Sequence, residues 1–279
     1  MSGDSLYVED LRQLAADAAD VARRHCGSCQ NMHLLWPYLR LTRATDGCSG
    51  ADLIQAALKR LVAEGGRRIL IAGAADTGVL AVVAQAVAPE NAIVVLDRCE
   101  TPLELCRRFA RHWSLSIDTR RVDLLDFAAE SEFDVALAHS LLQFIAPEHR
   151  VDVLSRLRRS LRPNGRLIIT FRRSARIEGS LLPEYRESYP KNLLERLDDM
   201  NIVLPEPRAV FLRRVEAYSE ERALREGAHR DRADVEQLIK AAGFLIESIT
   251  AIESTISTPF KKFADKLSKQ RFLAVAKPA

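Results

Sequence analysis

Long apolar runs are missing from this chain of 279 residues. A helix needs about 18 consecutive apolar residues to cross a bilayer, and no stretch of the sequence approaches that length. The opening residues MSGDSLYVEDL are polar and acidic, unlike the basic and then apolar segment of a secretory leader. We therefore expect a cytoplasmic protein that does not bind a membrane.

A large excess of one charge is missing as well. The 41 Lys and Arg residues and the 38 Asp and Glu residues leave a formal net charge of +3. Acidic and basic residues are interleaved along most of the chain, which is typical of a solvated surface. Because proteins that bind nucleic acid usually carry a basic stripe, nucleic acid is not an expected partner. A homodimer is compatible with this composition, which does not fix the oligomeric state.

The cysteines are few and odd in number, which argues against a disulfide framework. There are five, and a cytoplasmic chain keeps them as thiols. His25, Cys26, Cys29, His33 and Cys48 have spacings compatible with zinc ligands. No second paired motif accompanies the Cys-x-x-Cys, however, and helical segments with their own apolar faces flank it. We therefore expect these thiols to pack as small apolar side chains, with no bound metal.

The chain is long enough for one large domain with additions. Its hydrophobic fraction of 47% and its charged fraction of 28% are ordinary for a globular protein. Apolar residues three and four positions apart predict helices over residues 5–25 and 49–64, separated by an irregular stretch over 26–48. We interpret residues 1–65 as an N-terminal helical cover and residues 66–279 as the main domain.

From residue 66 onward the pattern changes to short apolar runs separated by helical segments. Such runs are typical of strands buried on both faces of a parallel sheet. Their alternation with helices predicts an α/β fold with a doubly wound sheet, in which ligands bind at the carboxyl ends of the strands. The predicted strands cover residues 68–72, 92–96, 116–122, 133–138 and 166–171.

Residues 174–230 break this alternation. They predict helices near 191–200 and 210–226, and we interpret them as a helical insertion that acts as a lid. The last two predicted strands, 244–252 and 271–277, are joined by a polar, Lys-rich stretch rather than by a helix. The final pair is therefore expected to be antiparallel. This completes a seven-stranded, mostly parallel sheet with an antiparallel last strand.

Two features at the ends of the first two strands predict a ligand that contains ribose. The first strand runs into Gly73-Ala74-Ala75-Asp76-Thr77-Gly78, whose small residues let a ligand approach the backbone. Asp97 ends the second strand, where an acid about 20 residues beyond such a loop accepts hydrogen bonds from ribose hydroxyls. Taken singly, the loop is compatible with a tight turn that binds nothing, and Asp97 with a helix cap. Their joint spacing favours ribose binding.

The order of these segments resembles the class I S-adenosylmethionine-dependent methyltransferases, which have a Rossmann-like fold. The resemblance is carried by RRILIAGAADTGVLAVVAQAV, AIVVLD, RRVDLLDF, EFDVALAHSLLQFI and LRRSLRPNGRLIITF, and by Ala-Ala-Gly-Phe at residues 241–244. It covers residues 66–173 and 232–277, and the order and spacing of the segments are more specific than any one of them. It implies that S-adenosylmethionine is the cofactor and that the chain is a methyltransferase.

The resemblance also implies which residues contact the cofactor. The loop would face its methionine portion, the ends of the second and third strands its ribose and adenine, and the end of the fourth strand its sulfonium. In these enzymes an acid usually precedes the loop, whereas this chain has Ile71 and Ala72 there, so Asp76 is expected to bind the ammonium group. The implied cofactor-binding residues are Gly73, Ala74, Asp76, Gly78, Asp97, Arg98, Asp123, Leu124, Ala138 and His139.

Methyl transfer mainly requires alignment of the acceptor, the methyl carbon and the leaving sulfur. A base is needed only for a protonated acceptor. His139 is the best candidate, and a histidine that is hydrogen-bonded within the site wall is an equal alternative. Arg172 is a candidate to bind an anionic acceptor, against the alternative of a solvated arginine. Tyr38, Tyr185 and Tyr189 are candidates to line the acceptor site, or only to pack the helices.

The preferred function is methyl transfer to a small molecule, because the N-terminal cover and the insertion could enclose one. The alternatives are a methyltransferase acting on protein or RNA, a non-catalytic Rossmann-like binding module, and a NAD-dependent oxidoreductase. The altered glycine loop supports the binding module. Short-chain dehydrogenases use a Tyr-x-x-x-Lys motif, which this sequence does not contain.

Overall fold

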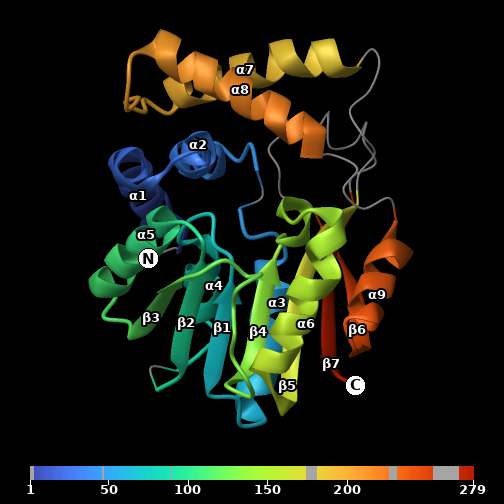
Figure 1. Ribbon diagram of the computed structural model, residues 1–279. Coiled ribbons are helices and arrows are strands. Elements are labelled where there is room, and N and C mark those ends of the chain that lie inside the picture. Colours follow the sequence, from blue (N-terminus) through green and yellow to red (C-terminus); the bar gives the residue numbers. More distant parts are fainter. Residues whose placement is uncertain (1–2, 46, 89, 174–180, 226–230, 254–269) are drawn as a thin grey trace. The chain divides into compact units, whose positions relative to one another are not determined.

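The computed structural model describes residues 3–45, 47–88, 90–173, 181–225, 231–253 and 270–279. These residues belong to two compact units (Figure 1). The sheet unit comprises Cys48–Arg173, Ala228–Glu253 and Gln270–Ala279, and the helical unit comprises mainly Met1–Gly47 and Ser174–Gly227. The polar stretch expected between the last two strands, and both ends of the expected insertion, lie outside the described residues. Among the described helices, none is long and apolar enough to cross a membrane.

A seven-stranded mixed sheet is the centre of the sheet unit. Its strand order is β3-β2-β1-β4-β5-β7-β6 (Figure 1). The strands from β1 to β5 pair in parallel, whereas β7 runs antiparallel to both β5 and β6. The predicted fold, a doubly wound sheet with an antiparallel last strand, is therefore confirmed. The strands are β1 (Arg68–Ala72), β2 (Ala92–Asp97), β3 (Ile117–Arg121), β4 (Phe133–His139), β5 (Leu161–Arg173), β6 (Phe244–Ile252) and β7 (Gln270–Pro278).

The central strands are buried on both faces, as their continuous apolar sequences predict. Successive side chains of a strand point to opposite faces. In β1, Leu70 and Ala72 belong to one apolar core, and Ile69 and Ile71 belong to the other. The two cores hold the strand ends in fixed register, and those ends carry the candidate site.

Helices cover both faces of this sheet. One core is closed by α6 (Arg150–Ser160) and α9 (Arg232–Ala241). The other is closed by α3 (Ala51–Ala63), α4 (Gly78–Ala84) and α5 (Glu100–His112). α3 falls within the interval 1–65 of the expected cover, yet Ile54, Leu58 and Leu61 of this helix share their core with the sheet. Two short 3₁₀ turns, η1 (Leu142–Phe144) and η2 (Pro147–His149), join β4 to α6.

The helical unit has an apolar core of its own. It contains α1 (Gly3–His25), α2 (Gln30–Leu41), α7 (Leu181–Asp199) and α8 (Arg208–Arg225). α1 and α2 pack against each other, as do α7 and α8, and α2 also packs against α8. Buried residues from all four helices make up this core, among them Ala19, Leu35, Leu193 and Phe211.

The helix α2 corrects the prediction that residues 26–48 are irregular. Pro37 lies inside this helix, and a proline normally disfavours a helix interior because it lacks a backbone N–H. Leu34, Leu35 and Leu39 are fully buried on the same helix. The free energy gained by burying several such side chains, each about 1.5–3 kcal/mol, exceeds the roughly 3 kcal/mol that the proline costs.

Candidate active site

The carboxyl ends of β2, β1 and β4 lie side by side, because the three strands are parallel neighbours in the sheet. Gly73 follows the last residue of β1, Asp97 ends β2 and His139 ends β4. These are the positions at which doubly wound sheets bind ligands. The three predicted site residues therefore lie at one edge of one rigid sheet.

The loop after β1 depends on a glycine at its first position. Gly73 has a φ of +79°, a conformation that glycine adopts without steric cost. Its N–H donates to the carbonyl oxygen of Leu96 at 2.8 Å, which ties the loop to β2. A Cβ atom at this position would lie 2.9 Å from Cδ1 of Leu141. The backbone angle and the limited space therefore both favour glycine at position 73.

The carboxylate of Asp97 joins the loop to the end of β2. Its Oδ2 accepts a hydrogen bond from the backbone N–H of Ala74 at 3.0 Å. Its Oδ1 accepts one from the N–H of Cys99 at 2.7 Å, at the start of α5. The side chain is only partly buried. Asp97 thus has an architectural role in addition to the role in ribose binding that the sequence suggests.

Asp76 is buried within the loop and caps the following helix. Its Oδ1 accepts a hydrogen bond from the N–H of Gly78 at 2.8 Å, at the first residue of α4. This N–H is one of the helix-terminal donors that need a partner outside the helix. The side chain is 3% exposed. Asp76 was expected to bind the ammonium group of the cofactor. One of its two carboxylate oxygens already accepts a hydrogen bond from the backbone.

The adenine side of the expected site follows β3. Oδ1 of Asp123 accepts a hydrogen bond from the N–H of Leu125 at 2.9 Å, which fixes the turn after the strand. Leu124 is 6% exposed and belongs to a core of the sheet. Arg98, one residue beyond β2, is exposed.

At the end of β4, His139 is held by a residue that the sequence analysis did not identify. Nδ1 of His139 lies 2.8 Å from Oγ1 of Thr170, which is its register partner on β5. The same oxygen accepts a hydrogen bond from the N–H of Ser140 at 2.9 Å, and Ser140 has a φ of +50°. Ala138, the preceding residue, is fully buried. The one sequence signal for Thr170 is a hydroxyl near the end of the otherwise apolar run RLIITF.

Comparison with known proteins identifies this part of the chain. Residues 69–165 match the family model of a methyltransferase domain. The match begins in β1 and ends in β5, and so includes the loop after β1, Asp97 and His139. The matched segment is a methyltransferase domain by this comparison, and the sheet unit that contains it is called the methyltransferase domain below.

One curated relative is similar to part of this chain. A carboxy-S-adenosyl-L-methionine synthase of Wolinella succinogenes is 32% identical over 114 residues, which are 41% of this chain and 47% of the relative. The match thus spans about half the length of that relative.

Solved structures share the fold of the methyltransferase domain at low sequence identity. A 1,6-didemethyltoxoflavin-N1-methyltransferase of Burkholderia thailandensis superposes with a TM-score of 0.51 at 14% identity, covering 100% of this chain and 92% of its own. A geranyl diphosphate methyltransferase superposes with a TM-score of 0.52 at 13% identity, covering 82% of this chain and 78% of its own. Both likenesses concern the fold.

The tyrosines expected to line an acceptor site lie outside the methyltransferase domain. Tyr38, Tyr185 and Tyr189 all belong to the core of the helical unit and are 1%, 2% and 2% exposed. Tyr38 contacts Phe211 edge to face, with ring centroids 5.3 Å apart. Burial raises the pKa of the Tyr38 phenol, so this side chain stays neutral. Core packing accounts for the burial of all three rings.

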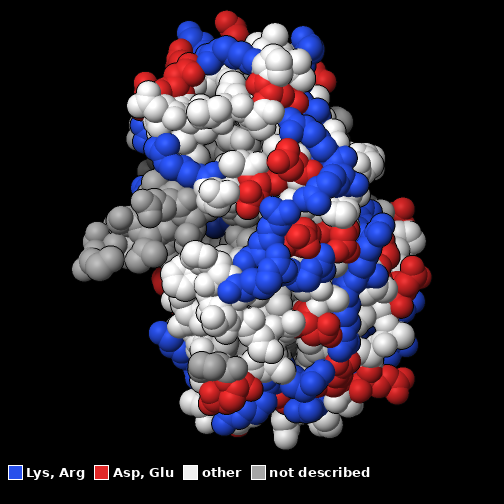
Figure 2. Space-filling view, turned by 90° about the vertical axis from the view of Figure 1, so that its left-hand side faces the viewer, with Lys and Arg blue, Asp and Glu red and all other residues white. Residues whose placement is uncertain are grey.

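Many arginines of the methyltransferase domain are neutralised by neighbouring carboxylates. Arg68 and Arg120 share Glu132, and Arg107 pairs with both Glu100 and Glu104. Basic and acidic side chains are interspersed on the face drawn in Figure 2. Arg172 lies near the carboxyl end of β5, partly buried, with Arg271 as its register partner on β7.

Proposed function

We propose that this chain transfers a methyl group from S-adenosylmethionine to a small-molecule acceptor. The observation that carries the proposal is the junction of Ala74 and Asp97, at the strand ends of the methyltransferase domain. It brings together a close-approach loop and a partly exposed carboxylate, the two elements that bind the two ends of an adenosyl ligand.

The cofactor-binding residues divide by element. The loop with Gly73, Ala74, Asp76 and Gly78 would contact the methionine portion. Asp97 would accept hydrogen bonds from the ribose hydroxyls, with Arg98 beside the adenine. Asp123 and Leu124 would contact the adenine, and Ala138 and His139 would face the sulfonium. When bound, the sulfonium supplies an already activated methyl group, so the protein's own task is alignment and exclusion of water.

The fit of these residues to the cofactor follows from their geometry. A glycine is favoured at position 73, where φ is +79° and a Cβ atom would lie 2.9 Å from Cδ1 of Leu141. Asp97 accepts one backbone N–H on each oxygen, and a carboxylate has about four acceptor positions, so these two hydrogen bonds are compatible with further bonds from a diol. The Gly78 N–H on Asp76 is compatible with a further donor in the same way.

The preference for a small acceptor rests on two supports. The structural relatives that carry cofactor analogues are named for small acceptors, one crystallised with geranyl diphosphate and sinefungin and another with 1,6-didemethyltoxoflavin and S-adenosylhomocysteine. Ion pairs neutralise several arginines of the sheet unit, among them Arg68, Arg107 and Arg120, which argues against nucleic acid as the acceptor. Arg172 is the residue we propose for an anionic group on the acceptor, since a guanidinium can bind carboxylate or phosphate with two hydrogen bonds.

His139 is the proposed base for acceptors that must lose a proton. Because its Nδ1 lies against Thr170, the other ring nitrogen, Nε2, is the one that would accept the proton. This role requires that the neutral ring carry its proton on Nδ1, and that this N–H donate a hydrogen bond to Thr170 Oγ1. That oxygen can accept hydrogen bonds from both the Nδ1–H of His139 and the N–H of Ser140, because a hydroxyl has two lone pairs.

Calorimetric titration with S-adenosylhomocysteine tests the ribose contact. We expect Asp97→Ala to weaken binding roughly 100-fold, since each hydrogen bond to a charged acceptor contributes about 1.5–3 kcal/mol. Asp126→Ala, at an exposed position on the same edge, is the matched control and should bind as the wild type does. A 2′,3′-dideoxy analogue should bind the wild type more weakly than S-adenosylhomocysteine does. Asp97→Ala should bind the analogue and S-adenosylhomocysteine with equal affinity. If removal of the ribose hydroxyls lowered the affinity equally in the wild type and in Asp97→Ala, the assigned contact would be refuted.

Mass spectrometry of the nucleoside product separates the proposed reaction from its alternatives. Methyl transfer converts S-adenosylmethionine to S-adenosylhomocysteine. A second candidate, favoured by the name of the Wolinella relative, is formation of a carboxylated S-adenosylmethionine. In that reaction a second, carboxylate-containing substrate would supply the carboxyl group, which would replace a proton of the methyl group, and the product has a different mass. Failure to bind either nucleoside, together with binding of NAD, would favour an oxidoreductase. Cofactor binding together with salt-dependent RNA binding would favour an RNA methyltransferase. Cofactor binding without turnover on any acceptor would favour a non-catalytic module.

A further inference from the structure

The connection between α1 and α2 brings three soft metal ligands together. Cys26 follows the last residue of α1, Cys29 precedes the first residue of α2, and His33 lies in the first turn of α2. The two sulfur atoms and an imidazole nitrogen all lie within 4.8 Å of one another. His25, in contrast, is exposed, and Cys48 belongs to the sheet unit.

We propose that Cys26, Cys29 and His33 bind one zinc ion. Thiolate and imidazole are ligands that zinc prefers. In a tetrahedral site with Zn–S bonds of about 2.3 Å and a Zn–N bond of about 2.0 Å, the ligand atoms are about 3.5–3.8 Å apart. Sγ of Cys26 and Nδ1 of His33 are 3.2 Å apart, so only small side-chain shifts would be needed to place all three ligands around one ion.

The backbone holds these ligands in place. The N–H of Cys26 donates to the carbonyl oxygen of Ala22 at 2.9 Å, which ties this residue to the last turn of α1. The N–H of Gln30 donates to the carbonyl oxygen of Gly27 at 3.2 Å, closing a tight turn between the two cysteines. The N–H of His33 donates to the carbonyl oxygen of Cys29 at 3.2 Å. The Cys-x-x-Cys turn and the histidine one helical turn later are thus parts of one rigid segment.

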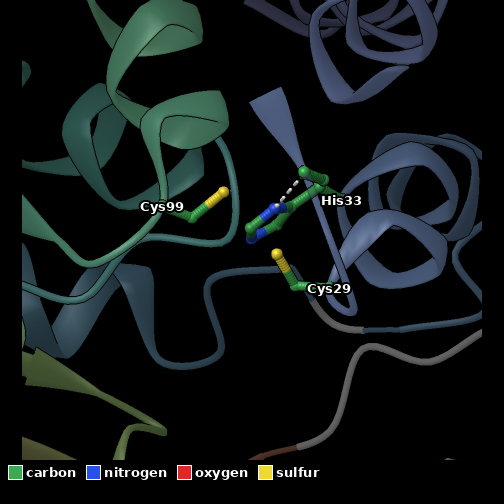
Figure 3. A group of neighbouring side chains, drawn as sticks. Cys29, His33 and Cys99 are labelled. Carbon is green, nitrogen blue, oxygen red and sulfur yellow. Dashed lines mark hydrogen bonds between the residues drawn. The ribbon is translucent and has the colours of Figure 1, made fainter. Parts of the chain in front are cut away.

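Burial and orientation support the same conclusion. His33 is only 2% exposed, while the two cysteines are partly buried, so a metal bound by them would be partly shielded from water. The sulfur of Cys29 points towards the imidazole of His33 (Figure 3). Cys99, also labelled there, belongs to the sheet unit, where it precedes α5. Three protein ligands leave one tetrahedral position for water or another ligand.

Such an ion would fix the angle at which α2 leaves α1. Both helices contribute to the core of the helical unit, through Ala19 and Ala22 on one side and Leu34 and Leu35 on the other. A metal that binds the folded arrangement more tightly than the unfolded chain raises thermal stability by mass action. The proposal is independent of the methyltransferase reaction, because its ligands all lie in the helical unit.

The test is metal binding by the full-length chain under reducing conditions. We expect one equivalent of zinc per chain, and Co²⁺ in its place should give thiolate-to-cobalt charge-transfer absorption. Cys26→Ser/Cys29→Ser and His33→Asn should each lower the metal content at least tenfold. Cys106→Ala, which removes a buried thiol of the sheet unit, is the control and should retain one equivalent.

The cobalt spectrum of the unaltered chain does not depend on whether the variants fold. Absence of the charge-transfer band there would overturn the proposal. So would an equal loss of metal in Cys106→Ala, or a Cys26–Cys29 disulfide as the stable form in the presence of zinc and reductant. A chelator should lower the melting temperature of the wild type, and zinc should restore it, with no such response in Cys26→Ser/Cys29→Ser.

Discussion

Oγ1 of Thr170 lies 2.8 Å from Nδ1 of His139 and links the ends of β4 and β5. A histidine's hydrogen bond on one ring nitrogen sets which nitrogen carries the proton. In the arrangement proposed for a base, nitrogen NMR shifts should show the neutral imidazole protonated on Nδ1.

Thr170→Val should weaken that tautomer preference, and Thr170→Ser should preserve it. Loss of one neutral hydrogen bond costs about 1 kcal/mol, which corresponds to roughly a fivefold lower rate of S-adenosylhomocysteine formation if the proton transfer limits the rate. A wild-type imidazole protonated on Nε2 would contradict the assignment of His139 as a base.

Gly73→Ala should destabilise the sheet unit and weaken cofactor binding together. A left-handed backbone costs a non-glycine residue about 1–2 kcal/mol, and the new Cβ would also meet Leu141 at 2.9 Å. Chemical denaturation and calorimetric titration measure the two effects. Adding Leu141→Ala should remove the steric clash and leave the backbone cost. Gly27→Ala, where nothing lies within 4 Å of the added atom, should change neither quantity appreciably.

Glu132 should make the folded state sensitive to acid. The hydrogen bond from Arg120 lowers the pKa of this carboxyl below its ordinary value, and a hydrogen bond from Arg68 acts in the same direction. A lowered folded-state pKa adds stability above the unfolded pKa of about 4.3, and that stability is lost as pH falls through the folded value. The free energy of unfolding should therefore fall less steeply below about pH 4 in Glu132→Gln than in the wild type. Glu130→Gln, at an exposed position, is the control, and an unchanged slope in Glu132→Gln would contradict the prediction.

Tyr38 should matter for folding rather than for cofactor binding. Tyr38→Ala removes a ring that is 1% exposed, and such truncations cost about 3–5 kcal/mol. Tyr38→Phe keeps the packing against Phe211 and should cost far less. Melting temperature measures the stability change, and calorimetry measures the affinity for S-adenosylhomocysteine. If Tyr38→Phe had normal stability but a lower affinity for S-adenosylhomocysteine, the prediction would be wrong and Tyr38 would be assigned to the ligand site.

The sheet was predictable because its signals are local. Each central strand is a short apolar run, and the polar, Lys-rich sequence before β7 already indicated its antiparallel direction. The bulge in β5 was not predictable, since residues 162–165 lie between register pairs that only the partner strand β4 defines. α2 was missed because Pro37 is a local signal against a helix, whereas the burial of Leu34 and Leu35 depends on helices distant in sequence.

The candidate site was predictable to the extent that it lies at strand ends. Gly73, Asp97 and His139 each follow or end a predicted strand, and parallel topology brings such positions to one edge. The occupation of Asp76 by the Gly78 N–H and the contact of Thr170 with His139 depend on side-chain directions, which the sequence does not specify. The meeting of Cys26, Cys29 and His33 depends in the same way on how two helices join.

The place of β7 between β5 and β6 has a consequence for biosynthesis. β6 has β7 as its neighbour in the sheet, and β5 has β7 on one side. While the ribosome is still making residues 253–269, the backbone groups on that side of β5 have no strand to pair with, and β6 has no place in the sheet. The nascent protein should therefore stay protease-sensitive, and should depend on chaperones, until residues 270–278 emerge from the exit tunnel.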